Sequence, residues 1–175
     1  LNEEISGVRM MTSYIRVGGV AKDVTRGWLD GILDFIDYFP AKVDEYERLL
    51  TKNPIWLDRT EGVGVFTREE AINWSLSGPA LRASGVNWDI RKSKPYSGYE
   101  NFNFDIPTQN NGDIYDRYRV RIEEMRQSLA IIKQAMHKLP AGNYKTPDNK
   151  VSLPARETLH TSMEALIHHF KLVSE

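Results

Sequence analysis

The stretch DIYDRYRVRIEEMRQSLAIIKQAMHK, residues 113–138, carries the clearest structural signal in the 175-residue sequence. Its apolar side chains recur at alternating spacings of four and three residues, which places them on one face of a helix. Pro140 then interrupts the pattern. We therefore predict a long amphipathic helix with a narrow apolar seam, formed by Tyr118, Ile122, Met125, Leu129, Ile132, Met136 and Leu139.

Two further helices are predicted before this stretch. Residues 23–39 place apolar side chains at helical spacing, namely Trp28, Leu29, Ile32, Leu33, Ile36 and Phe39. Pro40 has no amide hydrogen to donate, so it predicts a break or kink. A second helix is therefore expected from about Ala41 to Lys52, with an apolar side formed by Val43, Tyr46, Leu49 and Leu50.

Shorter signals complete the pattern. Thr67 and Glu70 have the spacing of a capping box, which predicts a short helix through Trp74. A last helix is expected from about Pro154, carrying Leu159, Met163, Leu166, Ile167 and Phe170. Residues 85–112 are rich in turn formers, which predicts irregular chain with at most one short strand pair. The expected class is mainly α.

Composition excludes several functions. The formal net charge is −1, so no basic surplus attracts nucleic acid. The sequence has no Cys, which excludes disulfides, thiolate nucleophiles and cysteine-ligated Fe–S clusters within it. No apolar run reaches the length of a membrane span, and the first residues do not resemble a signal peptide. Because a helical pattern still runs at HHFKLVSE, we expect the sequence to be a piece of a longer protein.

Three candidate sites have simpler interpretations. His160, Glu164 and His168 lie four residues apart, but they lack the HExxH core of a metal site, so we favour a polar helix face. Gly62 and Gly64 form half of a dinucleotide loop without a surrounding βαβ unit, so we favour a turn. We find no arrangement typical of a catalytic nucleophile.

Two charged segments leave alternatives open. The Arg residues of RVRIEEMRQS, 119–128, either form a solvated face or pair with acidic residues of other segments; we favour the solvated face. The segment 78–99 mixes arginines and lysines with small and aromatic residues. It fits either a buried polar loop whose charges neutralise one another or the wall of a redox or substrate site.

Several segments together resemble one family. They are SYIRVGGV (13–20), SGPALRASGVNWDIRK (77–92), PYSGY (95–99), GDIYDRYRVRIEEMRQSL (112–129) and TSMEALIHHFK (161–171). In order, they are similar to the D subunit of NADH-quinone oxidoreductase, respiratory complex I. The resemblance implies a helical bundle core of the kind found in nickel-iron hydrogenase large subunits. It further implies that residues 1–175 form a single helical middle portion, without the N-terminal quinone-loop region and the C-terminal portion.

The family resemblance implies a function for the whole assembly. Electrons from NADH pass through FMN and Fe–S clusters to quinone, in a chamber next to the terminal cluster, and this transfer drives proton translocation. The implied partners are other peripheral-arm subunits, especially the terminal Fe–S cluster subunit. The implied location is peripheral, on the cytoplasmic or matrix side of the energy-transducing membrane. No cofactor, metal or catalytic residue is expected on this chain, and the isolated fragment is expected to be inactive.

The resemblance also carries over to individual residues. The IRxGG turn implies that Arg16, Gly18 and Gly19 lie on the terminal-cluster side of the chamber. The RASG and WDxRK motifs imply an internal framework, formed by Arg82, Ser84, Gly85, Asp89 and Arg91. We expect the Arg82 guanidinium to be buried against a carboxylate, with Asp89 the nearest in sequence. Two other functions remain open: a large-subunit-like component of a membrane-bound hydrogenase or related complex, and a non-catalytic helical interaction module.

Overall fold

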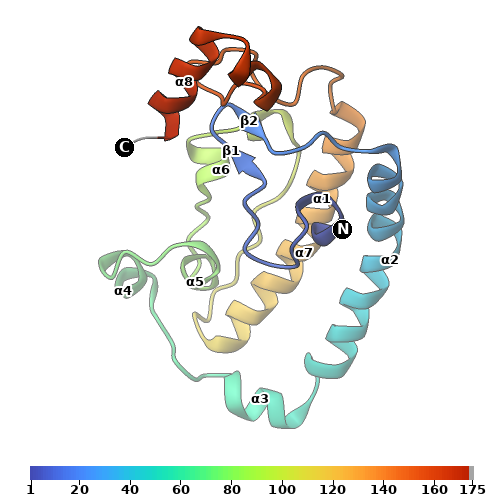
Figure 1. The fold of residues 1–175 in the computed structure, drawn as a ribbon. Coiled ribbons are helices and arrows are strands. Elements are labelled where there is room, and N and C mark those ends of the chain that lie inside the picture. The colour runs from blue at the N-terminus through green and yellow to red at the C-terminus, as the bar shows by residue number, and fades with distance from the viewer. Residues whose placement is uncertain (174–175) are drawn as a thin grey trace. The chain divides into compact units, whose positions relative to one another are not determined.

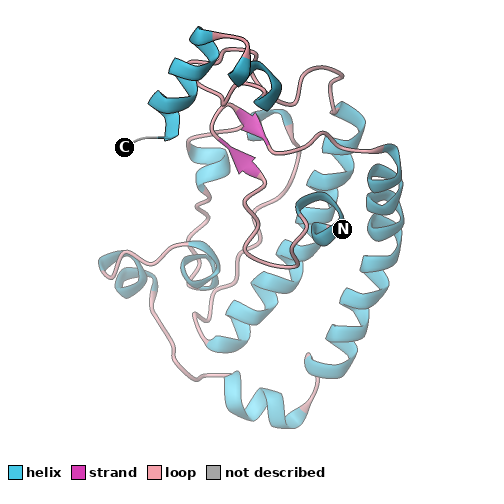
Figure 2. Ribbon diagram, viewed as in Figure 1, coloured by secondary structure: helices cyan, strands magenta, loops and turns pink. Residues whose placement is uncertain are grey.

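The computed structural model describes residues 1–173, which fold mainly into helices (Figure 1, Figure 2). The mainly α class is confirmed. None of these helices is both long enough and apolar enough to cross a membrane. In chain order the elements are α1 (Asn2–Ser6), β1 (Ile15–Arg16), β2 (Gly19–Val20), α2 (Arg26–Leu50), α3 (Pro54–Thr60), α4 (Arg68–Asn73), α5 (Gly78–Ala83), α6 (Ile90–Ser93), η1 (Tyr99–Asn101), α7 (Ile114–Lys138), η2 (Arg156–His160) and α8 (Met163–Val173), where η marks a 3₁₀ helix.

The chain divides into two compact units. Unit 1 contains Leu1–Ile32 and Pro140–Glu175, and unit 2 contains Leu33–Leu139. Unit 2 holds almost all of the buried apolar side chains of the described residues: Ile36, Val43, Ala71, Leu81, Ala83, Phe104, Val120, Ile122 and Leu129. The expectation of a single helical middle portion of a longer subunit stays a prediction.

Helix α7 is the centre of unit 2, as its seam predicts. Asp113 caps the helix, because its carboxylate accepts a hydrogen bond from the Asp116 amide at 2.7 Å. Ile122 and Leu129 of the seam are buried, and α7 packs against both α3 and α5. At its end the seam fails, because Leu139 is 52% exposed.

The predicted break at Pro40 is wrong. Helix α2 runs through Pro40 without interruption, so the two expected helices are one. Ile36 and Val43 lie two turns apart on one face and are both buried, and Phe35 stacks on Phe39 with 4.9 Å between ring centroids. Packing on both sides of Pro40 thus favours a continuous helix over the loss of one backbone hydrogen bond.

The last predicted helix is two elements. A 3₁₀ helix, η2, ends at His160, and α8 begins at Met163, where the Ser162 hydroxyl accepts a hydrogen bond from the Ala165 amide at 3.2 Å. His160 therefore does not continue the face of α8. The His168 Nε2 atom lies 3.5 Å from a Glu164 carboxylate oxygen, and within residues 1–173 no cluster of metal-binding side chains includes them.

The strand pair lies elsewhere than expected. Between residues 85 and 112 the chain forms α6 and η1 and no strand, whereas β1 and β2 form an antiparallel hairpin in unit 1. The hairpin lies early in the chain because Gly18 can take a positive φ, +84°, at the turn. In unit 2 the capping box of Thr67 and Glu70 is confirmed.

A test of the α7 seam is the truncation of Leu129. Leu129 is 8% exposed, so Leu129→Ala removes buried apolar contacts and leaves a cavity. We expect a loss of about 2–5 kcal/mol in the free energy of unfolding, measured by urea titration. Leu49→Ala is the matched control, because Leu49 is largely exposed on α2 and should cost less than about 0.5 kcal/mol. Equal effects of the two substitutions would show that the seam is misplaced.

Candidate functional site

The candidate site begins with a charged side chain inside unit 2. Arg82 lies in the last turn of α5 and is 5% exposed. Helix α5 is short, and two of its first residues, Gly78 and Pro79, favour a helix start. A buried guanidinium loses its hydration, so it requires negatively charged or polar partners.

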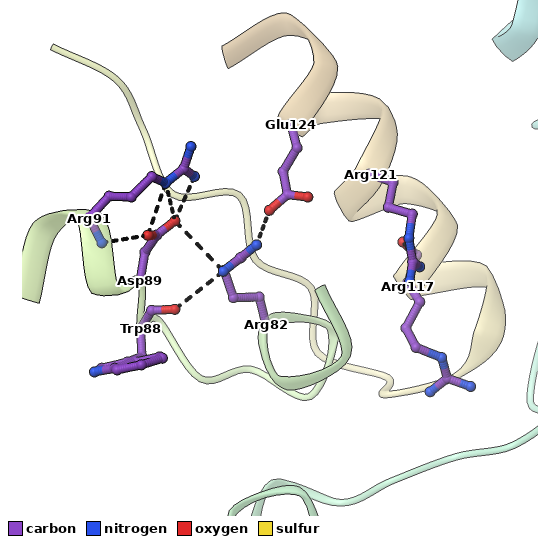
Figure 3. Close-up of polar contacts among 7 residues, drawn as sticks. All are labelled: Arg82, Trp88, Asp89, Arg91, Arg117, Arg121 and Glu124. Carbon is purple, nitrogen blue, oxygen red and sulfur yellow. Dashed lines mark hydrogen bonds and ion pairs between the residues drawn. The ribbon is translucent and has the colours of Figure 1, made fainter. Parts of the chain in front are cut away.

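Three groups surround the Arg82 guanidinium (Figure 3). One terminal nitrogen pairs with the carboxylate of Glu124, which α7 supplies. The other lies 3.7 Å from a carboxylate oxygen of Asp89 and donates to the Trp88 carbonyl at 3.4 Å. The expectation that Arg82 is buried and pairs with a carboxylate is confirmed, with Glu124 as the closer partner. The Nε atom of Arg82 is buried without a hydrogen-bond partner among the described residues.

Asp89 connects this pair to a second arginine. Its carboxylate caps α6 by accepting the Arg91 amide at 2.9 Å. The same carboxylate holds the Arg91 guanidinium through two nitrogens, with Nε at 3.0 Å and a terminal nitrogen at 2.6 Å. Such two-point pairs fix the orientation of both side chains. Asp89 thus organises both arginines at the start of α6.

The ionisation of the site follows from these contacts. Hydrogen bonds from Arg91 lower the pKa of Asp89, and the positive charges of Arg91 and Arg82 lower it further. The hydrogen bond to Asp89 raises the pKa of Arg91, whereas burial lowers the pKa of Arg82. Arginine remains protonated in proteins despite such shifts. The cluster therefore consists of two cations and two carboxylates that neutralise one another.

Aromatic rings support Arg91 from its other side. Its guanidinium carbon lies 4.8 Å from the ring centroid of Phe104 and 5.8 Å from that of Tyr99. These distances are those of cation–π contacts. Phe104 is buried, and this aromatic neighbour was not found from the sequence. The arginine is thus held between a carboxylate and apolar rings, which restricts its movement.

Ser84 and Gly85 anchor the loop that follows α5. The buried Ser84 hydroxyl donates to the Phe66 carbonyl at 2.9 Å. Gly85 has a φ of +80°, and a Cβ there would lie 3.1 Å from the Asn110 side-chain oxygen. A larger residue would be strained and crowded at this position. Both residues therefore serve the geometry of the loop.

A cavity of about 580 Å³ lies beside this cluster. It is lined by all four charged residues and by Trp88 and Tyr96, among others: Arg82, Asp89, Arg91 and Glu124. None of the four is a nucleophile, and each is occupied by an oppositely charged partner. The arrangement can form a rigid, neutral wall, and it has no group poised for proton transfer or covalent chemistry.

The remaining predicted residues lie in the hairpin of unit 1. Arg16 ends β1, and its Nε atom donates to the Ser13 carbonyl at 2.7 Å. Gly18 and Gly19 follow, and a Cβ on Gly19 would lie 2.4 Å from the Tyr144 carbonyl oxygen. That close approach requires glycine. The predicted residues thus fall into two groups, three in unit 1 and five in unit 2.

Long-range ion pairs were underestimated from the sequence. The favoured solvated face for residues 119–128 fits Arg119 and Arg121, which are exposed. Arg126, however, pairs with Asp44 at 3.1 Å and with Glu47, both on α2. Glu124 was likewise missed as the partner of Arg82. Its signal was the spacing from Asp116 through Val120 to Glu124, which defines a second buried face of α7 at four-residue intervals.

Comparison with known proteins gives a consistent result. The family model described as "Respiratory-chain NADH dehydrogenase, 49 Kd subunit" matches residues 1–175. The NADH-quinone oxidoreductase D subunit of Wolbachia sp. subsp. Brugia malayi (strain TRS) is 51% identical over 173 residues, which are 99% of this chain and 44% of the relative. The second of the NADH-quinone oxidoreductase D subunits of Roseiflexus sp. (strain RS-1) is 52% identical over 176 residues, which cover 99% and 42%. The chain thus spans less than half the length of these relatives.

Replacing Arg82 tests the ion cluster. Arg82→Ala leaves the carboxylates of Glu124 and Asp89 without their shared cation in a buried position. We expect a loss of about 3–5 kcal/mol in unfolding free energy by urea titration, with only partial recovery in Arg82→Lys, because lysine lacks the planar fork. Arg121→Ala is the control on the exposed side of α7 and should change stability by less than about 0.5 kcal/mol. An unchanged Arg82→Ala variant would contradict the framework role.

The lowered pKa of Asp89 predicts a pH dependence. A carboxylate whose pKa is lower in the folded state stabilises the fold above its unfolded pKa of about 3.9. That stability is lost as the pH falls below about 4 and through the folded pKa. Asp89→Asn should therefore be destabilised at pH 7 and lose less stability than the wild type between pH 5 and pH 2, measured by urea midpoints. The exposed Asp58→Asn should follow the wild type, and parallel curves for Asp89→Asn and the wild type would refute the assignment.

Proposed function

Because this chain belongs to the family of the 49-kDa subunit of respiratory-chain NADH dehydrogenase, we propose that it is part of a proton-translocating NADH-quinone oxidoreductase. The observation that carries the proposal is the match of the family model to residues 1–175, together with identities of about 50% to D subunits of that enzyme. In this role residues 1–175 are the helical middle portion of a longer subunit. The assembly passes electrons from NADH to quinone.

The chain contributes structure rather than redox chemistry to this reaction. The sequence has no Cys, so its residues do not fit the thiolate ligation of an Fe–S cluster. The same absence argues against a hydrogenase-type site held by paired cysteines within these residues. NADH, FMN, the Fe–S clusters and quinone therefore act on or with other subunits, and we propose that the purified 175-residue chain alone reduces no quinone.

The ion cluster supports a framework role beside the quinone-reduction chamber. Its four charged groups are paired, and Asp89 and Arg82 are buried. Because a paired, buried charge is costly to rearrange, the cluster fixes α5, α6 and α7 relative to one another. We propose that Arg16, Gly18 and Gly19 serve a separate part of the chamber, on the side of the terminal Fe–S cluster subunit.

The proposed subunit is peripheral. No helix of residues 1–173 qualifies as a membrane span, so contact with the membrane arm is proposed to occur through other subunits, on the cytoplasmic or matrix side. The proposed partners are the neighbouring peripheral-arm subunits, chiefly the one that holds the terminal cluster.

Gene replacement tests this proposal. Deletion of the gene should abolish quinone reduction by NADH in isolated membranes, and the full-length wild-type gene should restore it. Arg82→Ala in the full-length protein should lower the amount of assembled complex and the activity together, because a framework residue acts through folding. The residual complex should keep the wild-type KM for quinone.

Two outcomes would contradict the proposal. Membranes that keep NADH-quinone activity after deletion would exclude the role in this reaction. A fully assembled Arg82→Ala complex without activity would assign Arg82 to the reaction itself. The exposed Arg121→Ala serves as the control and should leave both assembly and activity unchanged.

A further inference from the structure

Unit 1 lacks the apolar core that unit 2 has. Among its described residues, 1–32 and 140–173, only Ser152, Pro154 and Ala165 are buried, and none carries a large apolar side chain. Several large apolar side chains are instead exposed, with Ile15 and Val17 of the hairpin at 85% and 78%. A unit of this size needs apolar burial for stability, so another surface must cover these side chains.

One groove gathers part of this exposed apolar surface. It encloses about 510 Å³ between the hairpin, the chain that follows α7, and the end of α8. Its apolar lining is provided by Val17, Val20, Val151, Leu153 and Leu172. Three of these, Val151, Leu153 and Leu172, are also exposed. The groove is therefore an unfilled apolar surface rather than a closed core.

Three cations line the same groove: Arg16, Lys22 and Lys145. No carboxylate is part of the lining. Arg16 and Lys145 contact only neutral groups, through donation to the Ser13 and Leu153 carbonyls at 2.7 and 2.6 Å. Within residues 1–173 none of the three cations forms an ion pair, in contrast to the arginines of the Arg82 cluster.

The hairpin beside the groove has one covered and one open edge. Strand β2 is bridged on its outer side by Lys145, and the Val20 amide donates to the Tyr144 carbonyl at 3.1 Å. Strand β1 pairs only with β2 among the described residues. An open strand edge offers backbone groups to an extended peptide, which can pair with it as an added strand.

We infer that this groove binds an acidic, apolar segment of a neighbouring protein subunit, lying along β1 with its carboxylates toward Arg16, Lys22 and Lys145. The apolar side chains of the segment would cover the valines and leucines of the groove, and its carboxylates would supply the missing charge. The inference rests on the proposed function, because it names the chemistry of one contact within that assembly.

A protein segment fits these observations better than a lipid. The fatty chains of an anionic lipid could cover the apolar lining, and its phosphate could meet the cations. A lipid has no backbone amides and carbonyls in the repeat of a strand, so it cannot pair with the open edge of β1. Only a peptide uses the edge, the apolar lining and the cations together.

Photo-crosslinking in the intact complex tests the inference. A benzoylphenylalanine at Val17 of the full-length protein, in native membranes, is irradiated, and the linked peptide is identified by mass spectrometry. We expect one defined segment of another subunit that contains Asp or Glu among apolar residues. Lys22→Glu should lower the crosslink yield about tenfold or more through like-charge repulsion. Lys52→Glu is the control, because Lys52 is exposed in unit 2 and does not line the groove.

Charge reversal on the partner keeps the test decisive if Lys22→Glu harms folding. Replacing the crosslinked carboxylate by Lys should restore the yield with Lys22→Glu, which a misfolded unit could not show. A crosslink to lipid, to another part of the same protein, or to a segment without a carboxylate would overturn the inference, as would the absence of any crosslink. NADH-quinone activity of the gene-deleted membranes is measured separately, so a failure of the proposed function is distinguished from a failure of the groove.

Discussion

The buried guanidinium of Arg82 is the constraint on which unit 2 depends. Its burial removes water from a permanent charge, so the fold must supply negative partners in the right place. Glu124 comes from α7, and Asp89 comes from the loop before α6. The backbone of Arg82 is engaged as well, because its carbonyl accepts the Gln109 amide at 3.0 Å. One residue thereby links α5, α6, α7 and the loop that precedes α7.

This constraint accounts for the mixture of residues between 78 and 99. The charges belong to the ion cluster, the aromatic residues support Arg91, and the small residues allow the chain to turn tightly. Gly85 adopts a positive φ, and Ser84 fixes the loop through the Phe66 carbonyl. A segment of this composition is expected where charged groups are neutralised inside a protein, and it needs no reactive chemistry to explain it.

The sequence predicted those features that depend on neighbouring residues. The apolar spacing of α7 and the capping box of α4 are local patterns, and both are confirmed. Pro40 misled the prediction, because packing around Ile36 and Val43 outweighs the local preference of proline. The choice of Glu124 over Asp89 as the closer partner of Arg82 depends on how α5 meets α7, which residues 42 positions apart cannot indicate by spacing alone.

The central claim is that the Arg82–Glu124 pair fixes α5 against α7, and a double-mutant cycle tests it most directly. The unfolding free energies of Arg82→Ala, Glu124→Ala and the double variant are compared with that of the wild type by urea titration. Residues that contact each other and share a network should show a coupling energy of about 1–3 kcal/mol, because the second substitution removes a charge that the first left unpaired. Additivity within about 0.5 kcal/mol would mean that the two side chains do not stabilise the fold as a pair, and it would contradict the account.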